Sequence, residues 1–190
     1  MKKLVSGMLT TLLLMCGFAF AASTDPSLSI YQLPALLTDT AGNKHPLDSY
    51  RGRPVLVTMF YGSCPAACPL LIDTLRATER ALAAKDHAAV RILMISIDPE
   101  RDTTAALAEL AKSRRLDTSR WELASTDATT VRKLAAVLNV QYRKLPDGGY
   151  NHTSVITLLD AHGQIIKRST LLGQADPELV AAVRQQTPGL

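Results

Sequence analysis

Two cysteines that are four positions apart are the strongest chemical feature of this sequence. They belong to the segment Cys64-Pro65-Ala66-Ala67-Cys68-Pro69, which directly follows a run of apolar residues. If the chain turns helical here, positions i and i+4 share one helix face, so both sulfurs point the same way. Backbone N–H groups at a helix start also stabilise thiolates, the form that attacks disulfides and binds metals. The pair is therefore predicted to be a redox-active dithiol, a metal site or both.

The spacing and number of the cysteines narrow the possible chemistry. A thioredoxin motif has two residues between its cysteines, whereas here there are three. A closed zinc site needs four ligands, and the only other cysteine is Cys16, near the N-terminus. Two thiolates and one imidazole suit copper, because sulfur holds Cu(I) and nitrogen helps to hold Cu(II). A purely structural disulfide across so short a loop would remove little chain entropy.

One of four histidines must supply the imidazole. His45, His87 and His162 fall in or beside predicted turns and polar loops, where we expect them to be solvated. His152 stands directly before a predicted buried strand, so its side chain could reach over the sheet end where the cysteine loop lies. From this position alone, a copper ligand and a histidine hydrogen-bonded within its own loop are both open.

Asp98 follows a second buried apolar run and is a further candidate for the site. It could orient His152, act on copper through another ligand, or accept a proton during thiol exchange. It could equally do no more than end its strand and cap the turn before Pro99. The charged residues 100–102 are predicted to form a solvated loop with local ion pairs.

Alternating strands and helices must position these residues. Dense apolar runs predict buried strands, and apolar residues at helical spacing predict amphipathic helices. This order predicts an α/β fold of the thioredoxin-like type, with a mainly parallel central sheet, flanking helices, an added N-terminal hairpin and a late antiparallel hairpin. The predicted strands cover 55–61, 90–97, 121–125, 152–160 and 164–169, the helices 70–85, 103–113, 128–138 and a last one from 177, and the N-terminal hairpin 36–47.

Three segments together resemble the SCO/SenC family, copper chaperones for the binuclear copper centre of cytochrome c oxidase. Residues 64–69 follow the family's CPxxCP pattern, residues 96–103 resemble its SxDPxRDT segment, and residues 150–154 are similar to its histidine segment. The resemblance runs from about Leu28 to the end of the chain. It implies a thioredoxin-like fold with Cys64, Cys68 and His152 as the ligands of a copper ion, Cu(I), Cu(II) or both.

The N-terminal segment has the pattern of a signal peptide. A positive start, an apolar stretch and the small-x-small pattern Ala19-Phe20-Ala21 predict cleavage after residue 21, which leaves one domain over 22–190 in the periplasm. An uncleaved membrane anchor and lipidation at Cys16 are the weaker alternatives. Loss of Lys2 and Lys3 lowers the formal net charge of +4 by two, and no basic run argues for nucleic acid or a membrane surface.

Two functions compete for the same pair of sulfurs. In the first, the protein is a metallochaperone that delivers copper to an oxidase subunit or to another periplasmic copper protein. In the second, Cys64 and Cys68 form a thiol–disulfide oxidoreductase that reduces an acceptor's cysteines without obligatory copper transfer. A peroxiredoxin-type peroxidase is disfavoured, because Tyr61 and Pro65 stand where that class places Thr or Ser before its cysteine. We expect a monomer that meets the membrane only through a partner or an uncleaved N-terminus.

Overall fold

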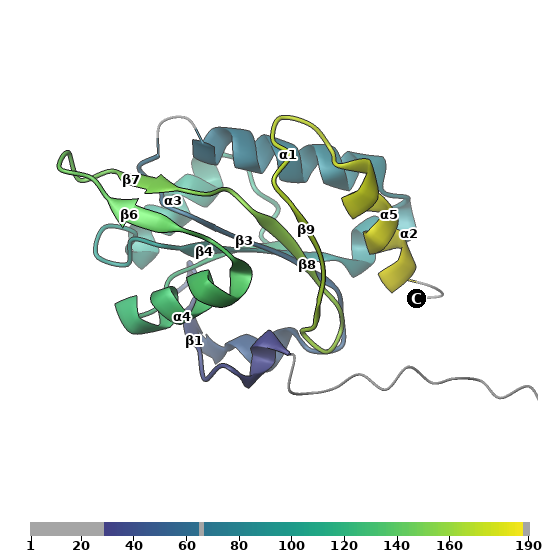
Figure 1. The fold of residues 1–190 in the computed structure, drawn as a ribbon, viewed down its shortest axis with the longest axis horizontal. Coiled ribbons are helices and arrows are strands. Elements are labelled where there is room, and N and C mark those ends of the chain that lie inside the picture. The colour runs from purple at the N-terminus through teal and green to yellow at the C-terminus, as the bar shows by residue number, and fades with distance from the viewer. Residues whose placement is uncertain (1–28, 65–66, 188–190) are drawn as a thin grey trace, which may run out of the picture.

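The computed structural model describes residues 29–64 and 67–187, which are arranged around a central β-sheet (Figure 1). The strands in chain order are β1 (Leu36–Thr38), β2 (Lys44–Pro46), β3 (Val55–Phe60), β4 (Arg91–Ser96), β5 (Trp121–Ala124), β6 (Tyr142–Lys144), β7 (Tyr150–His152), β8 (Ile156–Leu159) and β9 (Ile165–Ser169). The α-helices are α1 (Ala67–Ala81), α2 (Ala84–Ala89), α3 (Thr104–Ser113), α4 (Ala128–Leu138) and α5 (Pro177–Gln186), and short 3-10 helices cover Ile30–Gln32 and Leu47–Tyr50.

The central sheet has five strands in the order β5-β4-β3-β8-β9. β3 pairs in parallel with β4, and β4 pairs in parallel with β5. β8 runs antiparallel to β3, and a hairpin joins β8 to β9, so these last two strands are antiparallel as well. The predicted α/β architecture and both predicted hairpins are confirmed, but the sheet is mixed rather than mainly parallel.

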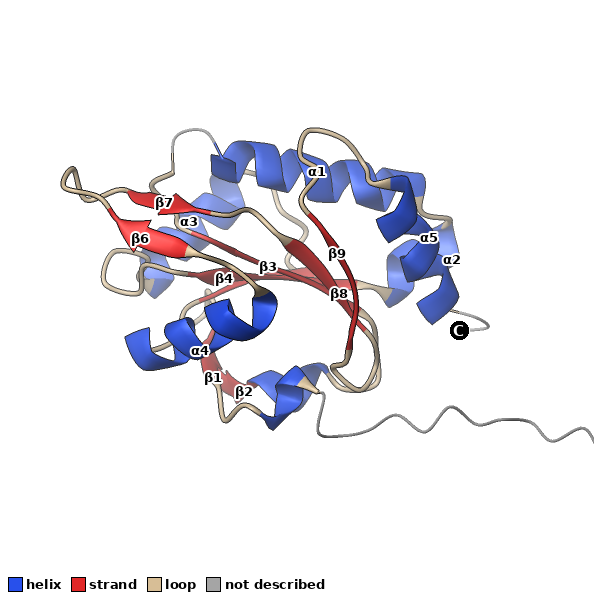
Figure 2. Cartoon of the chain, in the orientation of Figure 1, coloured by secondary structure: helices blue, strands red, loops and turns tan. Residues whose placement is uncertain are grey.

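Helices cover both faces of this sheet (Figure 2). β3 is buried along its whole length, so its side chains alternate between two apolar layers. Leu56 and Phe60 pack with residues of α1, α3 and α5 on one face. Val57 and Met59 pack with α4 and the N-terminal hairpin on the other face. Because both faces are covered, β3 is held firmly, and the loop that follows it starts from a fixed point.

Two predicted elements differ from the structure. The helix predicted over 70–85 is two helices, because the Leu82 N–H bonds to the Glu79 carbonyl and Ala83 is extended. The strand predicted over 152–160 begins only at Ile156. His152 belongs instead to β7, which pairs with β6 in a hairpin outside the main sheet that the sequence patterns did not predict.

The predicted signal peptide, with its cleavage site after residue 21 and Cys16, lies outside the described residues. Within residues 29–64 and 67–187, no helix is long and apolar enough to cross a membrane.

Candidate metal and redox site

The cysteine loop lies at the carboxyl end of β3. β3 ends at Phe60, and α1 begins at Ala67, which places Cys68 in the first turn of that helix. Pro65 and Ala66, between the two cysteines, are outside the described residues. Cys64 is half-buried, Cys68 is 3% exposed, and neither forms a disulfide. The pair is therefore available as a dithiol, with Cys64 as the more accessible sulfur.

One carbonyl group organises both cysteines. The Cys68 thiol donates a hydrogen bond to the Tyr61 carbonyl oxygen at 3.0 Å, and the Cys64 N–H donates to the same oxygen at 3.2 Å. Burial raises the pKa of Cys68 well above its usual value, and the neighbouring Cys64 raises it further. Cys68 is consequently a protonated thiol in this state, and it must lose a proton before it can bind metal or exchange disulfides.

His152 presents one ring nitrogen that is suited to a ligand. Its Nδ1 lies 3.2 Å from the Thr153 carbonyl oxygen, which can only accept, so Nδ1 carries the proton. The other nitrogen, Nε2, is buried and has no hydrogen-bond partner. Burial lowers the pKa of His152, which favours the neutral ring. A neutral imidazole with a fixed tautomer and a free Nε2 lone pair is what metal ligation requires.

Tyr61 connects the two halves of the site. Its ring contacts that of His152 edge to face, with centroids 5.6 Å apart. Its backbone carbonyl holds Cys68, and its side chain also interacts with Cys64. Among the described residues no three His, Cys, Asp or Glu side chains are already gathered closely enough to hold a metal ion. Both cysteines thus contact the Tyr61 carbonyl, and His152 contacts the Tyr61 ring. The three candidate ligands are not gathered at one point.

Asp98 lies at the rim of this site and is 1% exposed. It forms an ion pair with Arg101, and the Tyr150 hydroxyl lies 3.4 Å from its Oδ1 atom. Tyr150 in turn packs against Tyr61, with ring centroids 5.4 Å apart. The structure gives Asp98 no hydrogen bond to His152 within the described residues, so the link that it shows runs through the two tyrosines.

Asp102 is the site residue that the sequence reasoning missed. It is not part of a solvated loop, because it is only 3% exposed. Its two carboxylate oxygens accept the Gly62 N–H at 3.1 and 2.9 Å, and the Ser96 hydroxyl donates to the second of them. Burial raises the pKa of Asp102, and these hydrogen bonds oppose that change. The available signal was a carboxylate directly before the N-cap Thr103, near the carboxyl end of a strand paired with β3.

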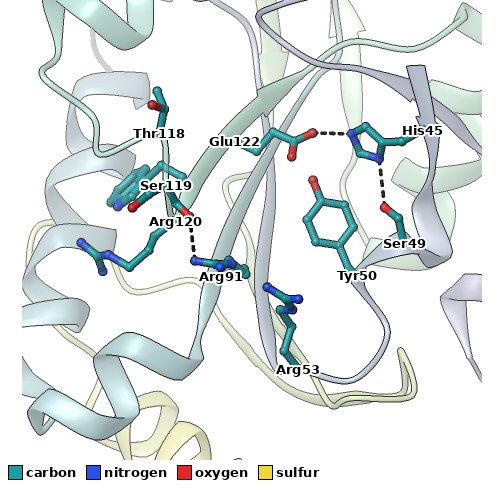
Figure 3. A pocket seen from close by; sticks show the side chains of 10 residues that line it. His45, Ser49, Tyr50, Arg53, Arg91, Thr118, Ser119, Arg120 and Glu122 are labelled. Carbon is teal, nitrogen blue, oxygen red and sulfur yellow. Dashed lines mark hydrogen bonds and ion pairs between the residues drawn. The ribbon is translucent and has the colours of Figure 1, made fainter. Parts of the chain in front are cut away.

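His45 is not merely solvated, because its ring contacts Glu122 and Ser49 (Figure 3). Its Nε2 lies 2.6 Å from Glu122 of β5, and its Nδ1 lies 3.0 Å from the Ser49 hydroxyl. These residues line a pocket of about 250 Å³ with Arg91, the first residue of β4. Cys64 follows the other end of the parallel strands, so His45 is remote from the cysteines.

The two remaining histidines are also outside the site. His87 is part of α2 rather than a loop, and it contacts Glu79 at 3.5 Å and Arg120 at 2.7 Å. His162 is exposed in the turn between β8 and β9, as predicted. His152 is therefore the one histidine in the described chain that contacts the residues around the cysteines.

The half-buried His152 predicts that the stability of the protein falls in acid. Its pKa is lowered in the folded protein, so the unfolded chain binds the proton more readily. The contribution is complete above the usual histidine pKa of about 6.5 and is lost as the pH falls through the folded value. With a chelator present, urea unfolding at about pH 7.5 and 5.5 should show a smaller acid loss for His152→Gln than for the wild type. Equal losses would contradict the prediction.

Comparison with known proteins places this arrangement in a family. The model of the SCO1/SenC family matches residues 29–187. The SCO1 protein homolog of Bacillus subtilis is 24% identical over 169 residues, which cover 87% of this chain and 86% of that protein. The mitochondrial SCO2 protein of Saccharomyces cerevisiae is 34% identical over 76 residues, 40% of this chain, and that match spans only 25% of the yeast protein.

Solved structures agree with this placement. Bradyrhizobium japonicum ScoI, solved with copper bound, has a TM-score of 0.66 and 30% identity, covering 80% of this chain and 97% of that one. BsSco, described with a disulfide switch as a member of the Sco family of cytochrome c oxidase assembly proteins, has a TM-score of 0.68 and 21% identity over 83% of this chain and 93% of that one. The predicted thioredoxin-like fold is thereby confirmed. The family match over most of its length, together with the B. japonicum relative, shows that this chain belongs to the SCO1/SenC family.

Proposed function

We propose that this protein is a copper-binding chaperone that uses Cys64, Cys68 and His152 to carry a copper ion to an acceptor protein. The observation that carries the proposal is that Tyr61 contacts all three candidate ligands. Its carbonyl oxygen accepts hydrogen bonds from both cysteines, and its ring packs against His152, whose Nε2 is buried and has no hydrogen-bond partner. The B. japonicum relative is a copper-bound protein. Soft sulfur ligands and one imidazole suit both oxidation states of copper.

The three candidate ligands differ in accessibility and in protonation, and this difference suggests an order in which they bind copper. Cys64 is half-buried and can meet incoming copper first. Cys68 must give up its proton and its bond to the Tyr61 carbonyl before its sulfur is a good ligand. His152 needs no deprotonation, because its free nitrogen already has a lone pair. A site that is completed only as copper binds also suits transfer, since an acceptor's ligands can replace these one at a time.

The acceptor that we propose is the binuclear copper site of a cytochrome c oxidase subunit. BsSco, a structural relative, is described as a member of a family of oxidase assembly proteins. The predicted signal peptide would place the mature domain, residues 22–190, in the periplasm. We expect this domain to be a monomer. The near-neutral charge expected after cleavage gives no reason to invoke nucleic acid as a partner.

The dithiol supports a second function at the same site. Cys64 and Cys68 are reduced and adjacent in the loop, and BsSco is described as having a disulfide switch. The pair would pass two electrons and two protons to an acceptor disulfide, which becomes a dithiol while Cys64 and Cys68 become a disulfide. Such a step would prepare an oxidised acceptor for copper, so reduction and delivery can follow one another.

A transfer experiment tests the chaperone proposal. The copper-loaded mature protein is mixed with the soluble copper-binding domain of an oxidase subunit whose cysteines are reduced, and the two are then separated. We expect most of the copper to move to the acceptor and its binuclear spectrum to appear. An acceptor with an oxidised cysteine pair should gain no copper unless the reduced, metal-free protein is added first. Copper that stays on the loaded protein with a reduced acceptor would reject delivery.

A further inference from the structure

One peptide unit lies between Asp102 and the cysteine pair. The unit that joins Tyr61 to Gly62 offers its N–H to both carboxylate oxygens of Asp102, at 3.1 and 2.9 Å. The carbonyl of the same unit accepts the Cys68 thiol at 3.0 Å and the Cys64 N–H at 3.2 Å. Because a peptide unit is planar and rigid, fixing its N–H also fixes the direction of its carbonyl.

Asp102, which anchors this peptide unit, is itself held in place by its neighbours. Asp102 is 3% exposed and accepts a further hydrogen bond from the Ser96 hydroxyl at the end of β4. Its own N–H donates to the Asp98 carbonyl at 2.9 Å. Thr103, the next residue, caps α3 by accepting the Ala106 N–H. Asp102 is therefore held by the end of one strand and the start of one helix, neither of which belongs to the cysteine loop.

The residue at position 62 fits this role. A Cβ atom added to Gly62 would lie 2.6 Å from the Asp102 Oδ1 atom, closer than real Cβ contacts come. Any side chain here would push the carboxylate and the peptide apart. The need for glycine follows from this close approach and not from an unusual backbone angle, since Gly62 does not have a positive φ.

We propose that Asp102 is a positioning residue that, through the Tyr61–Gly62 peptide, holds Cys68 in its reduced, hydrogen-bonded state and so shifts the dithiol–disulfide equilibrium toward the dithiol. The Cys68 S–H bond to Tyr61 exists only while the sulfur is protonated, and it is lost when a disulfide forms. Whatever strengthens that bond favours the dithiol. This inference rests on the proposed function only in taking Cys64 and Cys68 as the working pair.

The equilibrium with glutathione measures this effect directly. Oxidised glutathione takes two electrons and two protons from Cys64 and Cys68, which yields the protein disulfide and two reduced glutathione molecules. In Asp102→Ala the peptide loses its anchor, so we expect the equilibrium to shift toward the disulfide by about fivefold, the scale of one hydrogen bond. The protein disulfide is quantified after acid quenching and alkylation of the remaining thiols.

Two further variants test whether Asp102 acts by holding the Gly62 N–H or by its negative charge. The amide oxygen of Asp102→Asn can still accept the Gly62 N–H, so this variant should stay within about twofold of the wild type. Gly62→Ala leaves the carboxylate in place but forces it away, so it should shift the equilibrium as Asp102→Ala does. Gly62→Ala also keeps the test decisive if Asp102→Ala does not fold. An Asn variant that shifts as far as the Ala variant would overturn the positioning role in favour of a charge effect.

Asp160 provides a matched structural control. It is a buried aspartate, 7% exposed, that accepts two backbone N–H groups at 2.8 Å in the turn between β8 and β9. Asp160→Ala should lower the thermal stability without moving the glutathione equilibrium. A shift in that control as large as in Asp102→Ala would reject the proposal, because general destabilisation would then explain both. None of these measurements uses copper, so a failure of copper binding would leave this test intact.

Discussion

A protein with both Cys64→Ser and Cys68→Ser should bind Cu(I) roughly a thousandfold more weakly than the wild type, because soft thiolates are the ligands that Cu(I) prefers. Serine keeps the size of the side chain but offers a hydroxyl that stays protonated. Among the described residues around the loop, His152 would then be the one imidazole or thiol ligand left. Competition against a chromophoric Cu(I) chelator measures the affinity, with the mature protein kept reduced throughout.

The single variants refine this prediction. Cys64 is half-buried whereas Cys68 is 3% exposed and packed against the apolar layer of α1, α3 and α5. Cys64→Ser should therefore leave the thermal stability nearly unchanged, whereas Cys68→Ser buries a hydroxyl and should lower it modestly. Both should lose affinity for copper. Near-stoichiometric, tight Cu(I) binding by the folded double variant would refute the proposed ligands.

The sequence was sufficient for the parts of the fold that depend on continuous patterns. The dense apolar run before the cysteines gave β3, and Asp127 marked the start of α4 by accepting the Thr129 and Thr130 N–H groups. The β6–β7 hairpin could not be predicted in the same way, because its strands have only three residues each and are partly exposed. Its pairing, from Tyr142 to His152, depends on contacts between segments that carry no apolar alternation.

The candidate site was predictable where spacing carries the chemistry. Cys64 and Cys68 could be recognised because they are four positions apart and follow an apolar run that predicts a buried strand. Asp98 was a candidate because it follows a buried strand, but Asp102 could not be told apart from an ordinary loop carboxylate. The burial of Asp102 depends on how the turn after β4 folds over the end of β3. His45 was likewise predicted to be solvated, because its partner Glu122 lies 77 positions away and no local pattern joins the two residues.

The structure also shows why copper binding should involve a rearrangement. The Tyr61 ring packs against His152, and its backbone carbonyl holds the Cys68 thiol. Among the described side chains no ready-made metal cluster is present, so at least one ligand must move when copper binds. Cys64 is half-buried whereas Cys68 is 3% exposed, so Cys64 has less packing to lose than Cys68. Movement of Cys64 toward His152 is therefore the expected route.

His152→Ala should separate the two oxidation states of copper. The variant keeps both thiols, so its Cu(I) affinity should fall by roughly tenfold. Loss of the one nitrogen ligand in the proposed set should weaken Cu(II) binding by about a hundredfold. The sulfur-to-Cu(II) absorption band should shift or disappear in the variant. His162→Ala is the matched control, because it removes an exposed histidine from the turn between β8 and β9 and should leave the spectrum unchanged. If the spectrum of His152→Ala matched that of the wild type, the buried Nε2 would not be a ligand, and the protein would act through its two cysteines alone.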